Sequence, residues 1–350
     1  MAALVSPAAP ALPAVTTLAV AVALDLLVAE PPGRVHPVAL FGSVVGRVDR
    51  PWSRPRLVGV AAAVGLPLAA GVVAGGTVTA AAGVGARSGV GPKLLAVPVA
   101  GTLLFSLVSL RMLREVTAEV VGLTESDPDA ARESVRALVG RDAADLSPAD
   151  LRSAAVESAA ENLADGFAAP LAGFAGGATV GLAVAPAGVV PLAAGVSGAA
   201  WVKAVNTLDS MLGYRSKPVG WASARLDDAV MYLPARASAG CLAVAAGSVG
   251  ALSRARSWAR EPESPNSGWP MATAAAALDV RLAKPGRYAL NPAAGSPSVA
   301  DGERAVRLVG VAGAVAVAGA AGWLLAVGWL LPTMWWLSSD WPPAPAGVIG

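Results

Sequence analysis

The sequence predicts an all-α protein that crosses a membrane several times, with amphipathic helices and polar motif loops at one membrane face. Hydrophobic residues make up 55% of the 350 residues, charged residues only 14%, and the mean hydropathy is +0.59. Soluble domains carry about 25% charged residues, whereas about 20 apolar residues cross a bilayer. Charge-free stretches cover residues 57–86, 94–110, 166–202, 237–253 and 308–339. These runs are continuous rather than alternating, which argues against the strands of a membrane β-barrel.

The first 24 residues carry no charged side chain and form the first predicted span. They lack the basic start of a secretory signal, and cleavage after Ala-Val-Ala at 21–23 would fall just before an acidic motif. We therefore expect an uncleaved membrane helix.

The later apolar stretches differ in length. Residues 57–77 and 94–113 are expected to form a helical hairpin. The stretch 166–202 is long for one span and contains Pro186 and Pro191 near its middle, which favours a broken or re-entrant hairpin. For residues 229–253 we expect a short re-entrant or protein-buried helix, because a further crossing would place a basic segment on the outer side.

Four polar segments hold nearly all the charge, and we expect them within one membrane-embedded domain spanning 1–350. Segment 30–56 is short and rich in arginine, which places it, and the active site with it, on the cytoplasmic side of the cell membrane. Segment 111–165 is expected to form a helical insert packed against the membrane domain, and segments 203–236 and 254–307 to form motif-bearing loops.

The helical insert ends with a well-signalled helix. Ser147 is a suitable N-cap, Pro148 suits the first turn, and Gly166 is expected to end the helix. Glu157, Glu161 and Asp165 then recur every four residues and lie on one face. Like charges at that spacing need a cation, a basic partner or solvent to offset their repulsion.

Several classes of function and site are excluded or disfavoured. A net charge of +2 gives no indication of nucleic-acid binding. The single Cys241, in an apolar run, excludes an intrachain disulfide, and the single histidine excludes a multi-histidine zinc site. The stretch GVGARSGVGPKL at 83–94 lacks the spacing of a P-loop and is expected to be a turn between spans.

Four polar clusters lie at the edges of apolar stretches. They are DLLVAEPPGRVHP (25–37), ENLADG (161–166), NTLDSMLGYR (206–215) with RLDDAVMYLPAR (225–236), and SPNSGWP (264–270). Carboxylate and amide oxygens suit Mg²⁺, and arginines suit phosphate or carboxylate. Each cluster alone is equally explained by turns and caps. His36 is either a general base or a hydrogen-bonded loop residue, and Asp227 with Asp228 could instead be a helix N-terminal pair.

At these clusters the sequence resembles the CobD/CbiB family, membrane proteins of cobalamin biosynthesis. The matching stretches are DLLVAEPPGRVHPV (25–38), ENLADGFAAPL (161–171), NTLDSMLGYRSK (206–217), RLDDAVMYLPAR (225–236) and SPNSGWPMATAAAALDVRL (264–282). Three positions depart from the family pattern: Ala29-Glu30-Pro31 stands for a usual Gly-Asp-Pro, Met231 for a frequent Asn, and Ser267 for a usual Ala.

The resemblance implies an ATP-dependent carboxylate–amine ligase. It would join a propionate carboxylate of adenosylcobyric acid to (R)-1-amino-2-propanol or its O-phosphate, with ATP and Mg²⁺. The expected partners are the corrinoid, the small amino alcohol and the lipid bilayer, and other enzymes of the pathway are further candidates.

The resemblance also implies roles for individual residues. Glu161, Asp165 and Asp209 are expected to hold Mg²⁺–ATP, oriented by Asn162 and Asn206, while Arg215, Arg225 and Arg236 meet phosphates or the corrinoid carboxylate. Asp25, Glu30, His36, Asp227 and Asp228 are the expected catalytic residues, the first three for amine binding and proton transfer. Tyr214, Lys217, Asn266 and Trp269 are expected to contact substrate. Glu157 lies outside the matched motifs and is expected to be solvated.

Two other classes of function fit the composition. A membrane transporter would place ionisable residues and broken helices near the bilayer midplane, and only Pro186 and Pro191 favour it. A non-catalytic membrane scaffold for corrinoid enzymes is the third possibility.

Overall fold

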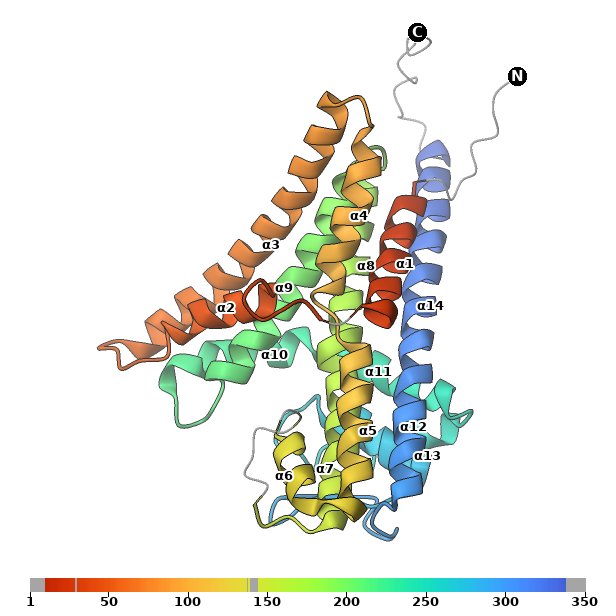
Figure 1. Cartoon of the computed structure of the whole chain (residues 1–350). Helices are drawn as coiled ribbons and strands as arrows, with labels where there is room; N and C mark the ends of the chain where they lie inside the picture. Colours follow the sequence, from red (N-terminus) through yellow and green to blue (C-terminus); the bar gives the residue numbers. More distant parts are fainter. Residues whose placement is uncertain (1–9, 29, 137, 139–143, 338–350) are drawn as a thin grey trace.

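The structure is a computed structural model, and it describes residues 10–28, 30–136, 138 and 144–337 (Figure 1). The beginning of the first predicted span, the motif position Ala29 and residues 338–339 of the last apolar stretch lie outside the described residues.

Apolar helices form one half of the molecule, here called the membrane half. It consists of α1 (Leu12–Leu27), α3 (Pro55–Arg87), α4 (Pro92–Phe105), α8 (Ala169–Val184), α9 (Val190–Leu212) and much of α14 (Val299–Leu337). Within the described residues, four helical stretches are long and apolar enough to cross a membrane, namely Pro55–Arg87, Pro92–Ser126, Pro148–Val184 and Val299–Leu331. The all-α polytopic membrane class is therefore confirmed.

The membrane half is built from closely packed helices and exposes apolar side chains outward. Helices α8 and α9 form the hairpin expected within 166–202, with Gly188 at φ 84° in its turn. A side chain at Gly173 would meet the backbone of Gly198 on the facing helix, so the two axes can approach only because these positions are glycine. On α3, Val72 and Val73 are 73% and 68% exposed, as suits a surface that faces lipid.

The other half, here called the polar half, contains the helical insert. It comprises α5 (Leu110–Ser126), α6 (Pro128–Val135), α7 (Pro148–Leu163), α12 (Val249–Ala255) and α13 (Gly268–Leu278). Helices α5, α6 and α7 share a small buried core that includes Val120, Val135 and Leu151. Ser147 caps α7 as expected, accepting a hydrogen bond from the Asp150 amide at 3.2 Å.

The helix that begins at Pro148 does not end at Gly166, so that prediction was wrong. Helix α7 runs through a π-helical turn, η1 (Ala164–Ala168), directly into α8. The Gly166 carbonyl accepts a hydrogen bond from the Ser109 amide at the junction of α4 and α5. This contact with a distant segment stabilises a wide turn where the sequence signalled a stop.

Three short helices lie where the two halves meet. They are α2 (Pro37–Gly46), the 3₁₀ turn η2 (Pro218–Gly220) with α10 (Trp221–Val230), and α11 (Tyr232–Ala245). Helix α11 packs against α13, α14 and η1, which agrees with the protein-buried alternative for 229–253. A small hairpin, β1 (Leu282–Lys284) with β2 (Tyr288–Leu290), was not predicted; Gly286 at φ 72° makes its turn.

The chain passes repeatedly between the two halves. The start of α1, the end of α14 and the α3–α4 and α8–α9 turns all lie at the far end of the membrane half (Figure 1). The polar clusters from α1, η1, α9 and α10 consequently meet at the boundary between the halves.

Candidate active site

Three carboxylates from three elements converge on one amide at this boundary. Asn206 on α9 is buried, and its side chain lies within interaction range of both Asp165 of η1 and Asp227 of α10. Asp209 lies one turn beyond Asn206 and within electrostatic range of both acids. We call Asp165, Asp209, Asp227 and Asn206 the acid centre.

Local structure explains how these side chains meet. Asn206 and Asp209 are three residues apart on α9 and share a face. The π turn inserts one extra residue into the helix, which changes the direction in which Asp165 points relative to Glu161. Helix α10 packs across α9 and brings Asp227 to the same place.

The acid centre holds buried oxygens without a partner. Oδ1 of Asp209 and Oδ1 of Asp227 are both buried and accept no hydrogen bond from the described residues. Burial, together with the charges of Asp165 and Asp209, raises the pKa of Asp227 to about 8. An unpaired buried acceptor costs roughly 1–3 kcal/mol, a cost that a bound cation or hydrogen-bond donor would offset.

Lys203, one turn before Asn206, is the residue that sequence reasoning missed. Its ammonium lies in the field of both Asp165 and Glu30, and so joins the acid centre to the loop after α1. The available signal was its position: it is one of four lysines and the first charge after 37 uncharged residues.

Glu30 and His36 face each other beside Lys203. His36 Nε2 lies 3.7 Å from Glu30 Oε2, while its Nδ1 accepts a hydrogen bond from the Val38 amide and caps α2. Burial and the charge of Lys203 lower the pKa of His36, and burial with the charge of Asp25 raises that of Glu30. A neutral His36 with Nδ1 engaged carries its proton on Nε2, toward Glu30.

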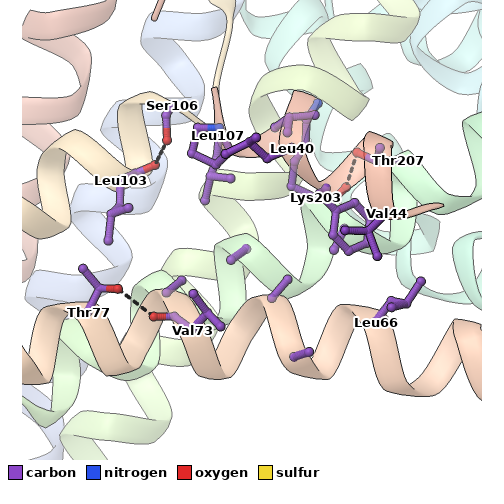
Figure 2. A pocket seen from close by; sticks show the side chains of 18 residues that line it. Leu40, Val44, Leu66, Val73, Thr77, Leu103, Ser106, Leu107, Lys203 and Thr207 are labelled. Atoms are coloured by element: carbon purple, nitrogen blue, oxygen red, sulfur yellow. Dashed lines mark hydrogen bonds between the residues drawn. The ribbon is translucent and has the colours of Figure 1, made fainter. Parts of the chain in front are cut away.

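An apolar cavity of about 430 Å³ adjoins Lys203 between α2, α3, α4 and α9 (Figure 2). The hydroxyls of Thr77, Ser106 and Thr207 in its wall donate to carbonyls of their own helices. Their donors are therefore already used within the protein. Lys203 is the one charged side chain among the described residues that line the cavity.

Glu161 and Asn162 lie at the edge of the acid centre. Glu161 is in the field of Asp165, Glu157 and Lys284, whereas the Asn162 amide turns back to donate to Ser158 O and Oγ, both at 3.0 Å. Within the described ranges, no three Asp, Glu, His or Cys side chains are already gathered as metal ligands. The metal-binding roles of Glu161, Asp165 and Asp209 stay predictions.

Two acids outside the acid centre have partners within the protein. Asp25 is 4% exposed and accepts a hydrogen bond from the Arg111 amide at 3.2 Å, at the beginning of α5. Glu157 is 5% exposed and accepts hydrogen bonds from Ser153 Oγ at 3.0 Å and Tyr288 Oη at 2.7 Å. The expectation of a solvated Glu157 was therefore wrong.

A second network lies on the α10–α11 side. Arg236 Nη1 donates to Asn266 Oδ1 at 3.0 Å, and its guanidinium stacks 3.5 Å from the Tyr232 ring centroid and 5.2 Å from that of Trp269. Asn266 Nδ2 donates to the Asp228 carbonyl at 2.8 Å. This network thus contacts the residue next to Asp227.

Five candidates lie at or near the surface, outside the acid centre itself. The Asp228 carboxylate, whose pKa is raised by burial, pairs with Arg225 at 3.7 Å. Arg215 pairs with Glu263 at 3.6 Å. Lys217 Nζ pairs with Asp49 at 2.7 Å and stacks beside the half-exposed Tyr214.

Met231, where the family pattern often has Asn, is 2% exposed. It packs in an apolar cluster with Ala164, Ala169 and Val202, next to the π turn. At this position the chain supports η1 with a packed side chain rather than with an amide.

Comparison with known proteins agrees with the motif pattern. The CobD/Cbib protein family matches residues 18–318. A probable cobalamin biosynthesis protein CobD of Methanothrix thermoacetophila is 35% identical over 308 residues, which cover 86% of this chain and 94% of that protein. Cobalamin biosynthesis proteins CobD of Rhodobacter capsulatus and Mycobacterium tuberculosis are 36% and 37% identical, covering 83% and 81% of this chain and 91% and 88% of those proteins. No solved structure matches.

Proposed function

The chain belongs to the CobD/CbiB protein family, and on that premise we propose that it catalyses an ATP-dependent amide ligation in cobalamin biosynthesis. The reaction joins a carboxylate of adenosylcobyric acid to the amine of (R)-1-amino-2-propanol or of its O-phosphate.

The chemistry has two steps. The carboxylate oxygen attacks the terminal phosphorus of ATP, giving an acyl phosphate and ADP. The amine then attacks the acyl carbon, the amide bond forms, phosphate leaves with the electrons of the broken C–O bond, and the amine loses one proton to a base. Both steps need positive charge near phosphoryl oxygens, and the second needs a proton acceptor.

The acid centre fits Mg²⁺ because two of its carboxylates, Asp209 and Asp227, have buried oxygens without a partner. Mg²⁺ in proteins is held by one or two carboxylates and completes its shell with phosphates and water. When bound, it would neutralise charge on the transferring phosphoryl group. Asn206 fixes Asp165 and Asp227 in place, and Asp165 supplies further negative charge beside them.

Lys203 and Arg236 supply the cations on the two flanks of the acid centre. Lys203 lies on the side of Glu30 and orients the reacting carboxylate or phosphate by charge. Arg236 is held by Asn266 on the opposite side, beside Asp228.

Glu30 is the best-placed proton acceptor for the amine. Its raised pKa makes it a stronger base than an ordinary carboxylate, and His36 at 3.7 Å holds it in place. Asp25 acts on this region through its charge and its contact with the start of α5.

We place the acid centre on the cytoplasmic side of the cell membrane. The short polar segment 30–56 contains five arginines and two acids, which favours the cytoplasm. ATP is also supplied on that side.

The carrying observation is the pair of unpartnered carboxylate oxygens of Asp209 and Asp227, in a centre whose third carboxylate, Asp165, lies in the field of Lys203. The test uses the full chain purified in detergent, supplied with adenosylcobyric acid, ATP, Mg²⁺ and each amine in parallel. We expect an amide product and stoichiometric ADP by mass spectrometry with at least one amine. Absence of product with both amines, together with uptake of solute into reconstituted vesicles, would replace the ligase by a transporter.

A further inference from the structure

A second cavity lies on the polar half, separate from the acid centre. It is a groove of about 970 Å³ between α11, α12 and the turns that lead to α13. Three arginines and two aromatic rings stand in its wall, and we call it the arginine groove: Arg236, Arg256, Arg260, Tyr232 and Trp269.

The groove carries an excess of positive charge. Glu263 is the one acid among its described lining residues, and its carboxylate is engaged by Arg287 at 2.9 Å and Arg215 at 3.6 Å. Arg256 and Arg260 are exposed and make no ion pair within the described residues. Guanidinium groups that face one space without a partner favour an anion with several charges.

Arg236 is held in a fixed orientation at the inner end of the groove. Its guanidinium stacks on Tyr232 and donates to Asn266 and to the Tyr232 carbonyl, at 3.0 and 2.7 Å. A guanidinium that is already oriented loses little entropy on binding an anion.

The groove connects to the acid centre through Asn266. One side of this amide accepts from Arg236, and the other donates to the carbonyl of Asp228, next to Asp227. The inner end of the groove is therefore tied, through hydrogen bonds of Asn266, to the residue that follows Asp227 in the chain.

We infer that the arginine groove binds the phosphate chain of a nucleoside triphosphate, with Arg256 and Arg260 as phosphate ligands. A phosphate chain presents several anionic groups in a row, which matches three guanidiniums arranged along one groove. The aromatic rings of Tyr232 and Trp269 offer flat surfaces that a nucleobase can cover. This inference rests on the proposed ligase for the identity of the nucleotide, ATP.

The test measures ATP binding directly, without turnover, on the full chain in detergent. Arg256 and Arg260 are replaced together by alanine, and the matched control replaces the exposed Arg87 and Arg136, which removes the same charge elsewhere. We expect the Arg256→Ala/Arg260→Ala variant to bind ATP at least about tenfold more weakly, because two charge-assisted contacts are lost. The control variant should bind as the wild type does.

Further arms identify the ligand chemistry. Tripolyphosphate should compete with ATP and adenosine should compete weakly, since the arginines contact phosphates. The Arg256→Lys/Arg260→Lys variant should recover part of the affinity, because it keeps the charge and loses the guanidinium fork. Elution of both variants at the wild-type position in size-exclusion chromatography confirms that they fold.

The outcomes separate this inference from the proposed function. Unchanged ATP affinity in the alanine variant overturns the groove assignment and leaves the ligase standing. If the alanine variant loses ATP affinity but the wild type forms no amide product, the groove assignment stands and the ligase is overturned. If the arginines affect only binding to vesicles of anionic lipid, the groove is a headgroup site and the inference is wrong.

Discussion

Buried carboxylates in two regions of this molecule have opposite surroundings. Glu157 on α7 accepts hydrogen bonds from Ser153 and Tyr288 and is 5% exposed. In the acid centre, Asp209 and Asp227 each keep a buried oxygen that accepts no hydrogen bond from a described residue. The helix that carries Glu157 reaches the acid centre two turns later, at Asp165.

The difference separates structural from functional acids. The bonds to Glu157 attach the β1–β2 hairpin, through Tyr288, to α7, and so they stabilise the fold. The unpartnered oxygens of Asp209 and Asp227 destabilise the fold by itself, and buried unsatisfied groups in native proteins call for an explanation such as a ligand. The comparison predicts opposite consequences when each acid is replaced.

The largest expected effect is on activity at Asp209. Asp209→Asn keeps the size of the side chain and removes the charge that would hold a cation. Amide formation should fall at least about a hundredfold, as when a preorganised electrostatic group is lost, while the folded protein remains at wild-type yield. The measurement is product formed per unit of monodisperse protein.

Asp165→Asn is the companion variant and should give a loss of the same kind. Asp129→Asn on α6, which changes an exposed acid paired with Arg132, is the control and should keep wild-type activity. Wild-type turnover by Asp209→Asn would break the comparison, because the unpartnered oxygen would then have no function.

The second effect is on stability at Glu157. Glu157→Ala leaves the hydroxyls of Ser153 and Tyr288 without their acceptor in a buried place, which should cost roughly 2–4 kcal/mol of unfolding free energy. Thermal unfolding in detergent measures it as a lowered Tm. Tyr288→Phe removes one donor and its hydroxyl together, so it should cost less.

Amide formation per folded molecule distinguishes a structural role of Glu157 from a role in the reaction. At a temperature where Glu157→Ala remains folded, it should retain most of the wild-type rate. A loss as deep as that of Asp209→Asn would show that Glu157 belongs to the reaction rather than to the scaffold.

The third effect is a pH dependence from Asp227. Its pKa is raised to about 8 in the folded protein, so the folded state keeps a proton that the unfolded chain releases near pH 4. Without Mg²⁺, the contribution of Asp227 to stability therefore decreases as the pH rises from about 4 to about 8. Mg²⁺ competes with this proton, so it should raise Tm more at about pH 9 than at about pH 6.

Asp227→Asn tests the assignment. The variant should be more stable than the wild type at about pH 9 without Mg²⁺, because it removes a buried charge, and it should lose most of the Mg²⁺ effect. An equal rise of Tm on adding Mg²⁺ at both pH values contradicts the role of Asp227.

The sequence predicted the fold class well because long charge-free runs leave few alternatives to membrane helices. It also selected Asp165, Asn206, Asp209 and Asp227, because their motifs are local. It failed where contacts between distant segments decide the outcome. Glu157 is buried by Tyr288, 131 residues away, and the helix continues past Gly166 because Ser109 contacts its carbonyl. Lys203 belongs to no motif, so only its place in space shows its role.

The smallest expected effect is at Lys217, which the motif resemblance assigned to substrate. Its ammonium pairs with Asp49 across the surface at 2.7 Å, and both side chains are partly exposed. Exposed ion pairs contribute roughly 0–1 kcal/mol. Asp49→Asn should thus lower Tm slightly. Lys217→Met should lower it somewhat more, because the ammonium also donates to the Met211 carbonyl at 3.0 Å, and the double variant should lower it no further than Lys217→Met.

The same two variants decide whether Lys217 contacts substrate. Asp49 is the ion-pair partner of Lys217 and has no predicted role in the reaction, so Asp49→Asn is the matched control. If Lys217 serves only the ion pair, both variants keep KM for the corrinoid and the amine. If Lys217 contacts substrate, Lys217→Met raises KM while Asp49→Asn does not, since removing Asp49 leaves the ammonium available. If KM rises in Lys217→Met alone, the functional region extends from the acid centre to this surface. If KM is unchanged in both variants, the functional region does not include Lys217, whose charge is already paired within the fold.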